Sequence, residues 1–340
     1  MNEERYLQAL EKELDCLKQE ERQDIIRDFR EYFSNGRSEG KTDTAIIDAL
    51  GTPAHIAEEL LKAYGEEDMK VTEEQPKGEY FTKVSIEADF ADLDIIPSPD
   101  DRAYVDMKDQ LSNKLITMDI VGDTLKIVIK EKKKWFAFGI ILTFGNAPKV
   151  TIKLPKRMYD MIRIDNDNGV TSAEQLHAIL MHIESDNGRI ILTDSASTNL
   201  HVETDNGRIT LKDVQCKTLT GETDNGRIEL HHVQTESVKV KTDNGRIDIQ
   251  EVTGAIEAET DNGRIEAFIP IITKPISLET DNGSIQLYVK EKPDNATIQT
   301  KKDMGKSIIF GEKTKKVILG NGLLPISLKT DNGSITVALR

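Results

Sequence analysis

The residues best suited to chemistry belong to one short motif, Thr-Asp-Asn-Gly-Arg-Ile, which recurs along the second half of the chain. Its carboxylate could bind Ca²⁺, as repeated acidic turns do in calcium-binding β-rolls. Those rolls carry several carboxylates per short repeat, whereas this motif supplies one Asp in about nineteen residues (186 − 167 = 19). We therefore expect no metal site in the motif. Its aspartates are Asp167, Asp186, Asp205, Asp224, Asp243, Asp261, Asp281 and Asp331.

The arginines of the motif form a second row, which the alternation of a β-strand places on the outside. This row could grip an extended partner or an anionic glycan. Alternatively, it could neutralise an outward row two residues before each Asp, because stacked like charges would otherwise repel by about 1 kcal/mol. We favour neutralisation. The arginines are Arg189, Arg208, Arg227, Arg246 and Arg264, and the facing row is Glu184, Glu203, Glu222, Lys241, Glu259 and Glu279.

A search for catalytic patterns finds no nucleophile–base pair, phosphate-binding Gly-rich loop or His-Glu metal helix. His182 and His201 occupy equivalent repeat positions and should be neighbours, but two histidines without a third ligand do not predict a metal site. We expect no catalytic residue, no metal and no cofactor, and hence no enzyme. A glycan-acting enzyme is the less favoured alternative, because a polysaccharide lyase needs an irregular Asp, Lys and Arg cluster.

One segment, Lys-Glu-Lys-Lys-Lys-Trp-Phe-Ala-Phe-Gly-Ile-Ile-Leu-Thr-Phe-Gly at 130–145, breaks the repetitive pattern. Lysines beside a Trp and aliphatic residues are typical of a membrane-interface contact. A second basic segment, 290–316, has eight lysines and four acids. If both face one way, anionic lipid would attract them by roughly 1 kcal/mol per Lys. Alternatively, residues 136–144 form a buried strand pair flanked by gatekeeper lysines. The candidate membrane contacts are Lys132, Lys133, Lys134, Trp135, Phe136 and Phe138.

The composition limits the partners and the compartment. The chain has 340 residues and a formal net charge of −15, which argues against nucleic acid as a partner. Its two cysteines, Cys16 and Cys216, lack the spacing of a disulfide framework or a zinc site and suit a reducing compartment. The first residues are charged and do not read as a signal peptide. The longest apolar run, 135–145, is shorter than the ~20 residues that span a bilayer. We expect a cytoplasmic protein, or one peripheral at the inner face of the membrane.

Residues 1–65 have the pattern of a small helical bundle. Apolar residues recur at spacings of three and four in 6–17 and in 25–33, which predicts two amphipathic helices. The Ser-Asn-Gly at 34–36 predicts the end of the second. A short third helix should end at Gly51, and Thr52-Pro53 predicts the cap and first residue of a fourth.

This stretch resembles the HAAS signalling domain. The matching residues are Asp-Phe-Arg-Glu-Tyr-Phe at 28–33, the run from Glu39 to Pro53, and Ile-Ala-Glu-Glu-Leu at 56–60. The resemblance implies an interaction module, so we expect a protein partner to bind residues 1–65. An acidic linker, 66–78, follows.

The repeats predict a solenoid. Apolar residues alternate with polar ones on both sides of each Asp-Asn-Gly, which indicates short strands joined by a tight corner. A meander of hairpins would need a second turn of equal quality in each repeat, and the sequence there is variable. We therefore favour a mainly β fold, a single-chain β-helix of ~19-residue coils after a small α-helical bundle. We expect the glycines to provide positive φ angles. These structural turn residues are Gly188, Gly207, Gly226, Gly245, Gly263, Gly283 and Gly333.

The β-helical domain is expected to cover residues 79–340. Irregular first coils should occupy 79–160, the repeats 161–288, an insertion 289–322 and the last coil 323–340. The final strand, Ser-Ile-Thr-Val-Ala-Leu-Arg, has no evident cap, which predicts end-to-end or edge pairing between copies.

Residues 79–340 resemble the "putative adhesin" or toastrack family, the YvlB- and LiaG-like domains of unknown function. The resemblance rests on Val-Thr-Ile-Lys-Leu-Pro-Lys at 150–156 and on His-Val-Glu-Thr-Asp-Asn-Gly-Arg-Ile-Thr-Leu at 201–211 with its copies. It implies a sensor or regulatory partner in bacterial cell-envelope stress. We therefore expect a non-enzymatic regulatory protein that acts by protein contacts and by contact with an anionic membrane surface. The alternative is a surface adhesin or structural β-helix.

Overall fold

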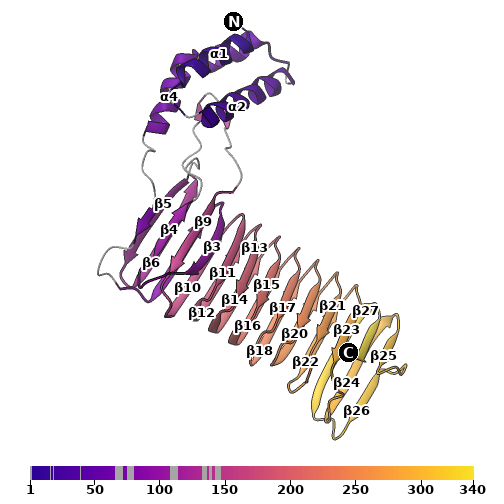
Figure 1. Ribbon diagram of the computed structural model, residues 1–340. Helices are drawn as coiled ribbons and strands as arrows, with labels where there is room; N and C mark the ends of the chain where they lie inside the picture. The colour runs from indigo at the N-terminus through magenta and orange to yellow at the C-terminus, as the bar shows by residue number, and fades with distance from the viewer. Residues whose placement is uncertain are drawn as a thin grey trace. The chain divides into compact units, whose positions relative to one another are not determined.

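The structure, a computed structural model, describes residues 2–15, 17, 19–38, 40–65, 72–74, 80–107, 114–131, 136–137, 140–141 and 147–340. The chain separates into two compact units, of which one contains the helices (Figure 1). The other comprises Thr72–Lys108, Leu115–Lys130 and Ala147–Arg340 and contains the long β-sheets.

The helical unit has four helices in its described part, which pack around one apolar core as the sequence predicts. The rings of Tyr6 and Phe33 meet edge to face with centroids 5.9 Å apart. Thr42 caps the third helix by accepting from the Ala45 amide, and Gly51 ends that helix. The helices are α1 (Glu3–Glu13), α2 (Gln19–Ser38), α3 (Asp43–Leu50) and α4 (Pro53–Gly65).

The second helix does not end at Ser-Asn-Gly as predicted, since α2 continues to Ser38. Gly36 lies within the helix and is buried. A Cβ atom there would lie only 2.7 Å from the Ile46 Cδ1 atom, so the packing requires a residue without a side chain. The helix is ended instead by Gly40, which has a φ of 82°. The Gly40 amide donates to the Arg37 carbonyl and the Lys41 amide to the Gly36 carbonyl, the paired bonds of a Schellman motif. Gly36 is therefore a packing residue.

The β unit is a solenoid in which each coil contributes one strand to each of two sheets, as predicted. We call the sheet with mostly shorter strands sheet A. Thirteen described strands form sheet A, in the spatial order β1 (Thr72–Glu74), β4 (Tyr104–Met107), β9 (Lys149–Leu154), β3 (Asp92–Pro97), β11 (Val170–Glu174), β13 (Arg189–Thr193), β15 (Ile209–Lys212), β17 (Ile228–His231), β19 (Ile247–Gln250), β21 (Ile265–Phe268), β23 (Ile285–Val289), β28 (Ile335–Leu339) and β25 (Ser307–Ile309).

Sheet B also has thirteen strands in the described part of the chain. Their spatial order is β26 (Lys316–Leu319), β24 (Ala296–Met304), β27 (Leu324–Asn332), β22 (Ile276–Thr280), β20 (Ala255–Thr260), β18 (Ser237–Thr242), β16 (Gln215–Thr223), β14 (Ala196–Thr204), β12 (His177–Ser185), β10 (Met158–Asn166), β2 (Lys83–Ala88), β6 (Thr124–Glu131) and β5 (Lys114–Val121).

The core lies between the two sheets and is built from equivalent residues in successive coils. Ile209 pairs in parallel register with Ile228, and Ile228 with Ile247, and all three are buried. Leu200 and Leu219 stack in the same way in sheet B. Burying one such aliphatic side chain stabilises the fold by about 1.5–3 kcal/mol, so the repeated column is the main source of stability.

The two ends of the solenoid are formed differently from the predicted simple stack. Near the N-terminal end of the unit, β2 and β3 lie inside, because β2 pairs with β10 and β6, and β3 with β11 and β9. The first strand, β1, lies at the edge of sheet A. The last strands are also interior, because β27 lies between β22 and β24, and β28 lies between β23 and β25. The coil predicted to be last, 323–340, is therefore enclosed.

The segment 289–322, predicted to be an insertion, supplies the terminal coil. Its strands β24 and β25 form that coil, and β26 adds an antiparallel edge to sheet B. The prediction that Ser-Ile-Thr-Val-Ala-Leu-Arg forms an uncapped end is wrong, because β28 is paired on both sides. The sequence misled here since 323–340 contains a regular motif, which indicates a coil but not its position.

The candidate membrane segment is only partly described. Phe136–Ala137 (β7) pairs antiparallel with Ile140–Ile141 (β8). Residues 132–135 and Phe138 lie outside the described residues, and so does the side chain of Phe136. Both interpretations of this segment stay predictions.

Candidate functional site

The Asp-Asn-Gly corner joins each sheet B strand to the following sheet A strand, and its glycines are required for a reason other than the predicted one. None of the motif's regular glycines from Gly188 to Gly333 has a φ in the left-handed range. Instead, a Cβ atom on Gly226 would lie 1.6 Å from the Gly207 carbonyl oxygen, and one on Gly245 equally close to that of Gly226. Glycine is needed because the corners of neighbouring coils stack in contact.

In five successive coils, positive φ angles occur at the other corner, where a sheet A strand leads to the next sheet B strand. The residues there are not glycines, and the sequence analysis missed them. They recur at the repeat spacing, a signal that could have marked them, and they are Gln175, Asp194, Asp213, His232 and Glu251, with φ of 48–55°.

The other polar groups of the motif form hydrogen bonds between coils. The buried Thr223 hydroxyl donates to the Gly207 carbonyl oxygen at 3.1 Å, and most other coils repeat this bond. The Asn225 amide nitrogen donates to the Asn206 side-chain oxygen at 2.9 Å, within a continuous asparagine ladder. The members of the ladder are Asn168, Asn187, Asn206, Asn225, Asn244, Asn262, Asn282 and Asn332.

The corner carboxylates show no arrangement for a metal. Within the described residues, no group of three or more His, Cys, Asp or Glu side chains is arranged to hold an ion. Burial raises the pKa of Asp167, and the neighbouring carboxylates of Asp186, Asp89 and Asp165 raise it further.

The arginine row lies on the outer face of sheet A, but its predicted partners are wrong. Arg227 pairs with Glu229 at 3.1 Å and Arg264 with Glu266 at 2.6 Å, both within sheet A. Arg208 also reaches Glu229, at 3.8 Å. The row predicted to face the arginines, which runs from Glu184 to Glu279 with one residue in each coil, lies on the outer face of sheet B. The two rows are separated because the corner between them turns the chain from one sheet to the other.

An acidic column in sheet A therefore pairs with Arg208, Arg227 and Arg264. It consists of Glu229, Asp248 and Glu266, which are in register on β17, β19 and β21. Burial raises the pKa of Asp248, while Arg246 and Arg227 act against the rise. The signal in the sequence was an acid two residues after the arginine in three successive coils.

The outer face of sheet B carries the predicted histidine pair. The rings of His182 and His201 stack with centroids 4.7 Å apart, which confirms that they are neighbours. Each ring Nε2 lies 3.1 Å from a carboxylate of its own strand, Glu184 and Glu203. The hydrogen bond with His182 is the main cause of a lowered pKa at Glu184, and Arg163, 2.9 Å away, adds to it.

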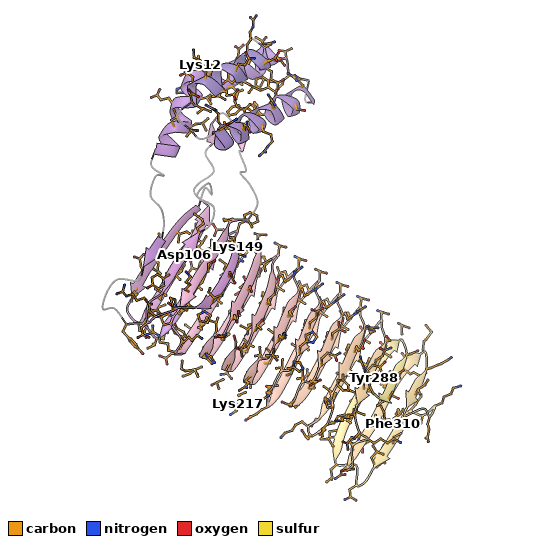
Figure 2. All side chains as sticks on the ribbon, in the orientation of Figure 1. Lys12, Asp106, Lys149, Lys217, Tyr288 and Phe310 are labelled. Carbon is orange, nitrogen blue, oxygen red and sulfur yellow. The ribbon has the colours of Figure 1, made fainter. Side chains whose placement is uncertain are left out.

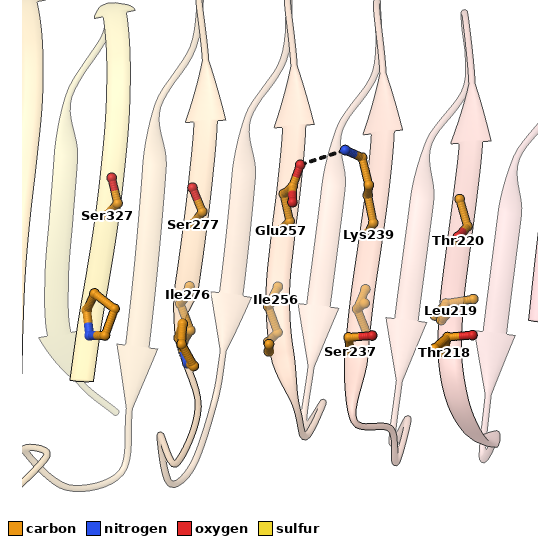
Figure 3. A pocket seen from close by; sticks show the side chains of 14 residues that line it. Thr218, Leu219, Thr220, Ser237, Lys239, Ile256, Glu257, Ile276, Ser277 and Ser327 are labelled. Carbon is orange, nitrogen blue, oxygen red and sulfur yellow. Dashed lines mark ion pairs between the residues drawn. The ribbon is translucent and has the colours of Figure 1, made fainter. Parts of the chain in front are cut away.

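A groove of about 450 Å³ lies further along the same face (Figure 3). Small side chains at equivalent positions, Thr218, Ser237 and Ala255, form part of its lining, and Lys239 pairs with Glu257 at 2.8 Å across it. The groove was not predicted, although the column of small residues was visible in the repeats. Its lining offers hydroxyl groups and one ion pair to a ligand.

The described helices include none with the length and apolar character needed to cross a membrane.

Three solved structures resemble this chain. A "putative lipid binding protein" from Parabacteroides distasonis is 16% identical, with 78% of this chain and 95% of that chain covered and a TM-score of 0.46. A "putative adhesin" from Bacteroides fragilis is 16% identical, with 78% and 96% covered and a TM-score of 0.42. A "putative cell adhesion protein" from Clostridium sporogenes is 11% identical, with 79% and 100% covered and a TM-score of 0.22. Comparison with curated protein sequences gave no match.

Two family models match the chain. The HAAS model matches residues 5–59, and the model described as Toastrack DUF4097 matches residues 81–338. Both resemblances noted in the sequence are thereby confirmed. The second match extends over most of the 340 residues. With its repeated corners, paired sheets and N-terminal HAAS domain, the chain belongs to the Toastrack DUF4097 family.

Proposed function

We propose that this chain is a non-enzymatic regulatory and interaction protein of a bacterial cell-envelope stress response. It acts from the cytoplasmic side of the membrane, through protein contacts and contact with the membrane surface. One observation carries the proposal: the polar groups of the repeated corner are engaged between coils. Thr223 and Asn225, for example, each hydrogen-bond to the preceding coil, so the motif builds a scaffold.

The helical unit provides the protein contact in this proposal. Its apolar residues are used in its own core, and its outer surface carries charged and polar residues such as Glu11, Lys12 and Glu58. A partner would therefore recognise a pattern of charges and shape on a small folded module.

Site-specific photo-crosslinking of the full chain in bacterial cells tests this function. A photoreactive amino acid is placed at Gln8, Lys12 or Ala54, which are exposed in the helical unit, and at Lys149 or Lys217 as solenoid controls. We expect one discrete protein adduct from helical positions, whose yield changes when the envelope is damaged. Adducts only from the control positions, or a yield that ignores envelope damage, would contradict the proposal.

A second assay separates this function from glycan chemistry. The full chain is incubated with bacterial polysaccharides, alongside Asp224→Asn, which changes one corner carboxylate. We expect no turnover by either protein. Turnover that is lost in Asp224→Asn would support the enzyme instead.

The alternative of an adhesive or structural β-helix draws on the groove in sheet B, whose hydroxyl-rich lining suits a polar ligand. Glycan-array binding by the wild type that is lost in Ser237→Trp would favour it over the regulatory function. Ser237 is exposed, so the added ring would fill the groove and leave the core unchanged.

A further inference from the structure

The C-terminal end of the solenoid is a separate surface, which we call the terminal cap and define as residues 290–323. It lies at the yellow end of the ribbon, where Phe310 is labelled (Figure 2). In a chain with a net charge of −15, its segment 290–316 has eight lysines and four acids. These lysines are Lys290, Lys292, Lys301, Lys302, Lys306, Lys313, Lys315 and Lys316.

The terminal cap is fixed to the core. The buried hydroxyls of Thr300 and Ser307 lie 2.7 Å apart at the end of the last coil. Thr300 donates to the Lys315 carbonyl oxygen and Ser307 to the Thr314 carbonyl oxygen, at 3.2 and 2.9 Å. These bonds hold the connection between β25 and β26 against the end of the core. The backbone that carries the lysines of this connection is therefore held in place.

The lysines of the cap have no acidic partners in the described part of the chain. None of the eight forms an ion pair there, whereas Lys153, Lys239 and Lys329, elsewhere in the solenoid, each pair with a carboxylate. Lys292 instead lies 4.9 Å from the centre of the Phe310 ring. A local excess of positive charge without ion pairs, in an acidic protein, indicates an anionic partner outside it.

Exposed aliphatic side chains accompany these lysines. Met304, Ile318 and Leu323 are 65%, 59% and 76% exposed. Ile318 is in register with Thr297 and Lys316 with Gln299, so an aliphatic and a basic side chain leave the same face of β26. A soluble polyanion needs only the charges. Aliphatic side chains between lysines fit the boundary between lipid headgroups and acyl chains.

We propose that the terminal cap docks on an anionic lipid bilayer, with its lysines at the headgroups and Ile318 and Leu323 inserted between them. This deepens the proposed function, and it relies on that function only for the membrane setting. It places the lipid contact at the opposite end of the solenoid strand order from β5 and β1, on residues that the structure describes in full.

Vesicle co-sedimentation of the full chain tests the proposal with phosphatidylglycerol–phosphatidylcholine vesicles and with pure phosphatidylcholine vesicles. The cap variant is Lys301→Glu/Lys313→Glu/Lys315→Glu. The matched control, Lys149→Glu/Lys212→Glu/Lys217→Glu, makes the same change in net charge elsewhere on the solenoid, and Figure 2 labels Lys149 and Lys217 away from the cap. We expect the wild type and the control to bind the anionic vesicles, and the cap variant to bind at least tenfold more weakly. Equal binding by both variants would overturn the proposal.

A second variant, Ile318→Ser/Leu323→Ser, keeps every charge and separates lipid from other anions. We expect it to lose several-fold in vesicle affinity, with unchanged binding to heparin, a soluble polyanion. Unchanged vesicle binding would identify a polyanion site and overturn the lipid proposal. Circular dichroism melts of each variant establish that it is folded, and light scattering shows whether the cap pairs two copies instead.

Failure of this proposal can be told from failure of the proposed function. If the wild type binds no vesicles, the lipid contact of the cap is wrong, while crosslinks from the helical unit still stand. If binding is lost in Trp135→Ser/Phe136→Ser/Phe138→Ser but kept in the cap variant, the contact lies in segment 130–145 and the cap proposal is overturned.

Discussion

At the scale of single residues, the repeated corner depends on how closely two coils can approach. The Gly226 and Gly207 backbones touch, the Thr223 hydroxyl bonds to the Gly207 carbonyl, and the Asn225 amide bonds to Asn206. Each residue of the motif therefore has a different contact with the coil before it. The same residues recur from coil to coil because each must make these contacts with the coil before it.

We predict that Gly226→Ala destabilises the protein by about 3 kcal/mol, because the new Cβ would meet backbone that cannot give way. The distance to the Gly207 oxygen would be 1.6 Å without a shift. Chemical denaturation of the full chain, followed by circular dichroism, measures the loss.

Gly221→Ala is the matched control, five residues earlier in the same coil. Its Cβ would meet only the Val240 side chain, at 3.2 Å, and Gly221 has no positive φ. We expect a change of less than about 1 kcal/mol, since an alanine is also the better residue in a strand. If both substitutions cost the same, stacking at the corner is not what requires glycine.

A second prediction concerns the buried threonines. Thr223→Val keeps the shape of the side chain but leaves the Gly207 carbonyl without its donor, which should cost about 1–3 kcal/mol. Thr220→Val, on the outer face of the same strand, is the control and should change the free energy of unfolding little. A comparison of urea unfolding curves would reveal a difference, and equal curves would contradict it.

At the scale of elements, the outer faces of the two sheets shift the pKa of a carboxyl group in opposite directions. In sheet A the acidic column is half-buried beside arginines, and burial raises the pKa of Asp248. In sheet B the hydrogen bond with His182 lowers the pKa of Glu184. These shifts have opposite consequences for stability as the pH changes.

We predict that Asp248→Asn raises the melting temperature at neutral pH. A carboxyl whose pKa is raised by folding stabilises the folded state when protonated, and this contribution is lost as the pH rises through the folded pKa. The gain from Asn should therefore vanish as the pH falls below the ordinary range of a carboxyl. Melting curves from pH 3 to pH 7 measure it.

Glu184→Gln should do the opposite and lower the melting temperature at neutral pH. A carboxyl with a lowered pKa stabilises the fold above its ordinary pKa, and the contribution is lost as the pH falls through the folded value. The deficit should therefore shrink in acid. The same sign for both variants would show that net charge alone governs stability.

The strands and the solenoid could be predicted from the sequence, whereas the role of the corner glycines and the partners of the arginines could not. The alternation around Ile209 and Ile228 specified strands, inward faces and a solenoid. The role of Gly226 was inferred wrongly because a glycine required by φ and one required by a neighbouring backbone are the same letter. The partners of Arg227 were missed because the sequence does not say which face a corner leads to. The lysines of segment 290–316 were visible in the sequence, but the exposure of Ile318 and the lack of ion pairs at those lysines among the described residues became known only from the structure.

At the scale of the whole β unit, the order of coils in space differs from their order in the chain. β2 and β3 are covered by β6 and β9, and β27 and β28 are covered by β24 and β25. The sequence could not predict this, because Thr330-Asp331-Asn332-Gly333 has the same form as an ordinary repeat. The local sequence shows that a segment forms a coil, but it does not show where in the stack that coil lies.

Hydrogen–deuterium exchange should follow the spatial order. We predict that the amides of β28, close to the chain end, are protected as strongly as those of β23, because both have partners on each side. The amides of β25 and β26, at the edges of sheets A and B, should exchange first among the C-terminal strands. Mass spectrometry of peptic peptides gives the comparison, and rapid exchange in 335–337 would contradict the enclosed position.

Enclosure of β2 and β3 near one end of the β unit, and of β27 and β28 near the other, also determines where such a protein can change length. A coil could be duplicated or lost in the run between Asp186 and Asp281 without disturbing either end, because every neighbour there offers the same contacts. Each added copy would lengthen the β unit by one strand spacing, about 4.8 Å. The unit can thus be regarded as a ruler with fixed end pieces and an adjustable middle, in which copy number sets the distance between a membrane-docking cap and the first coil.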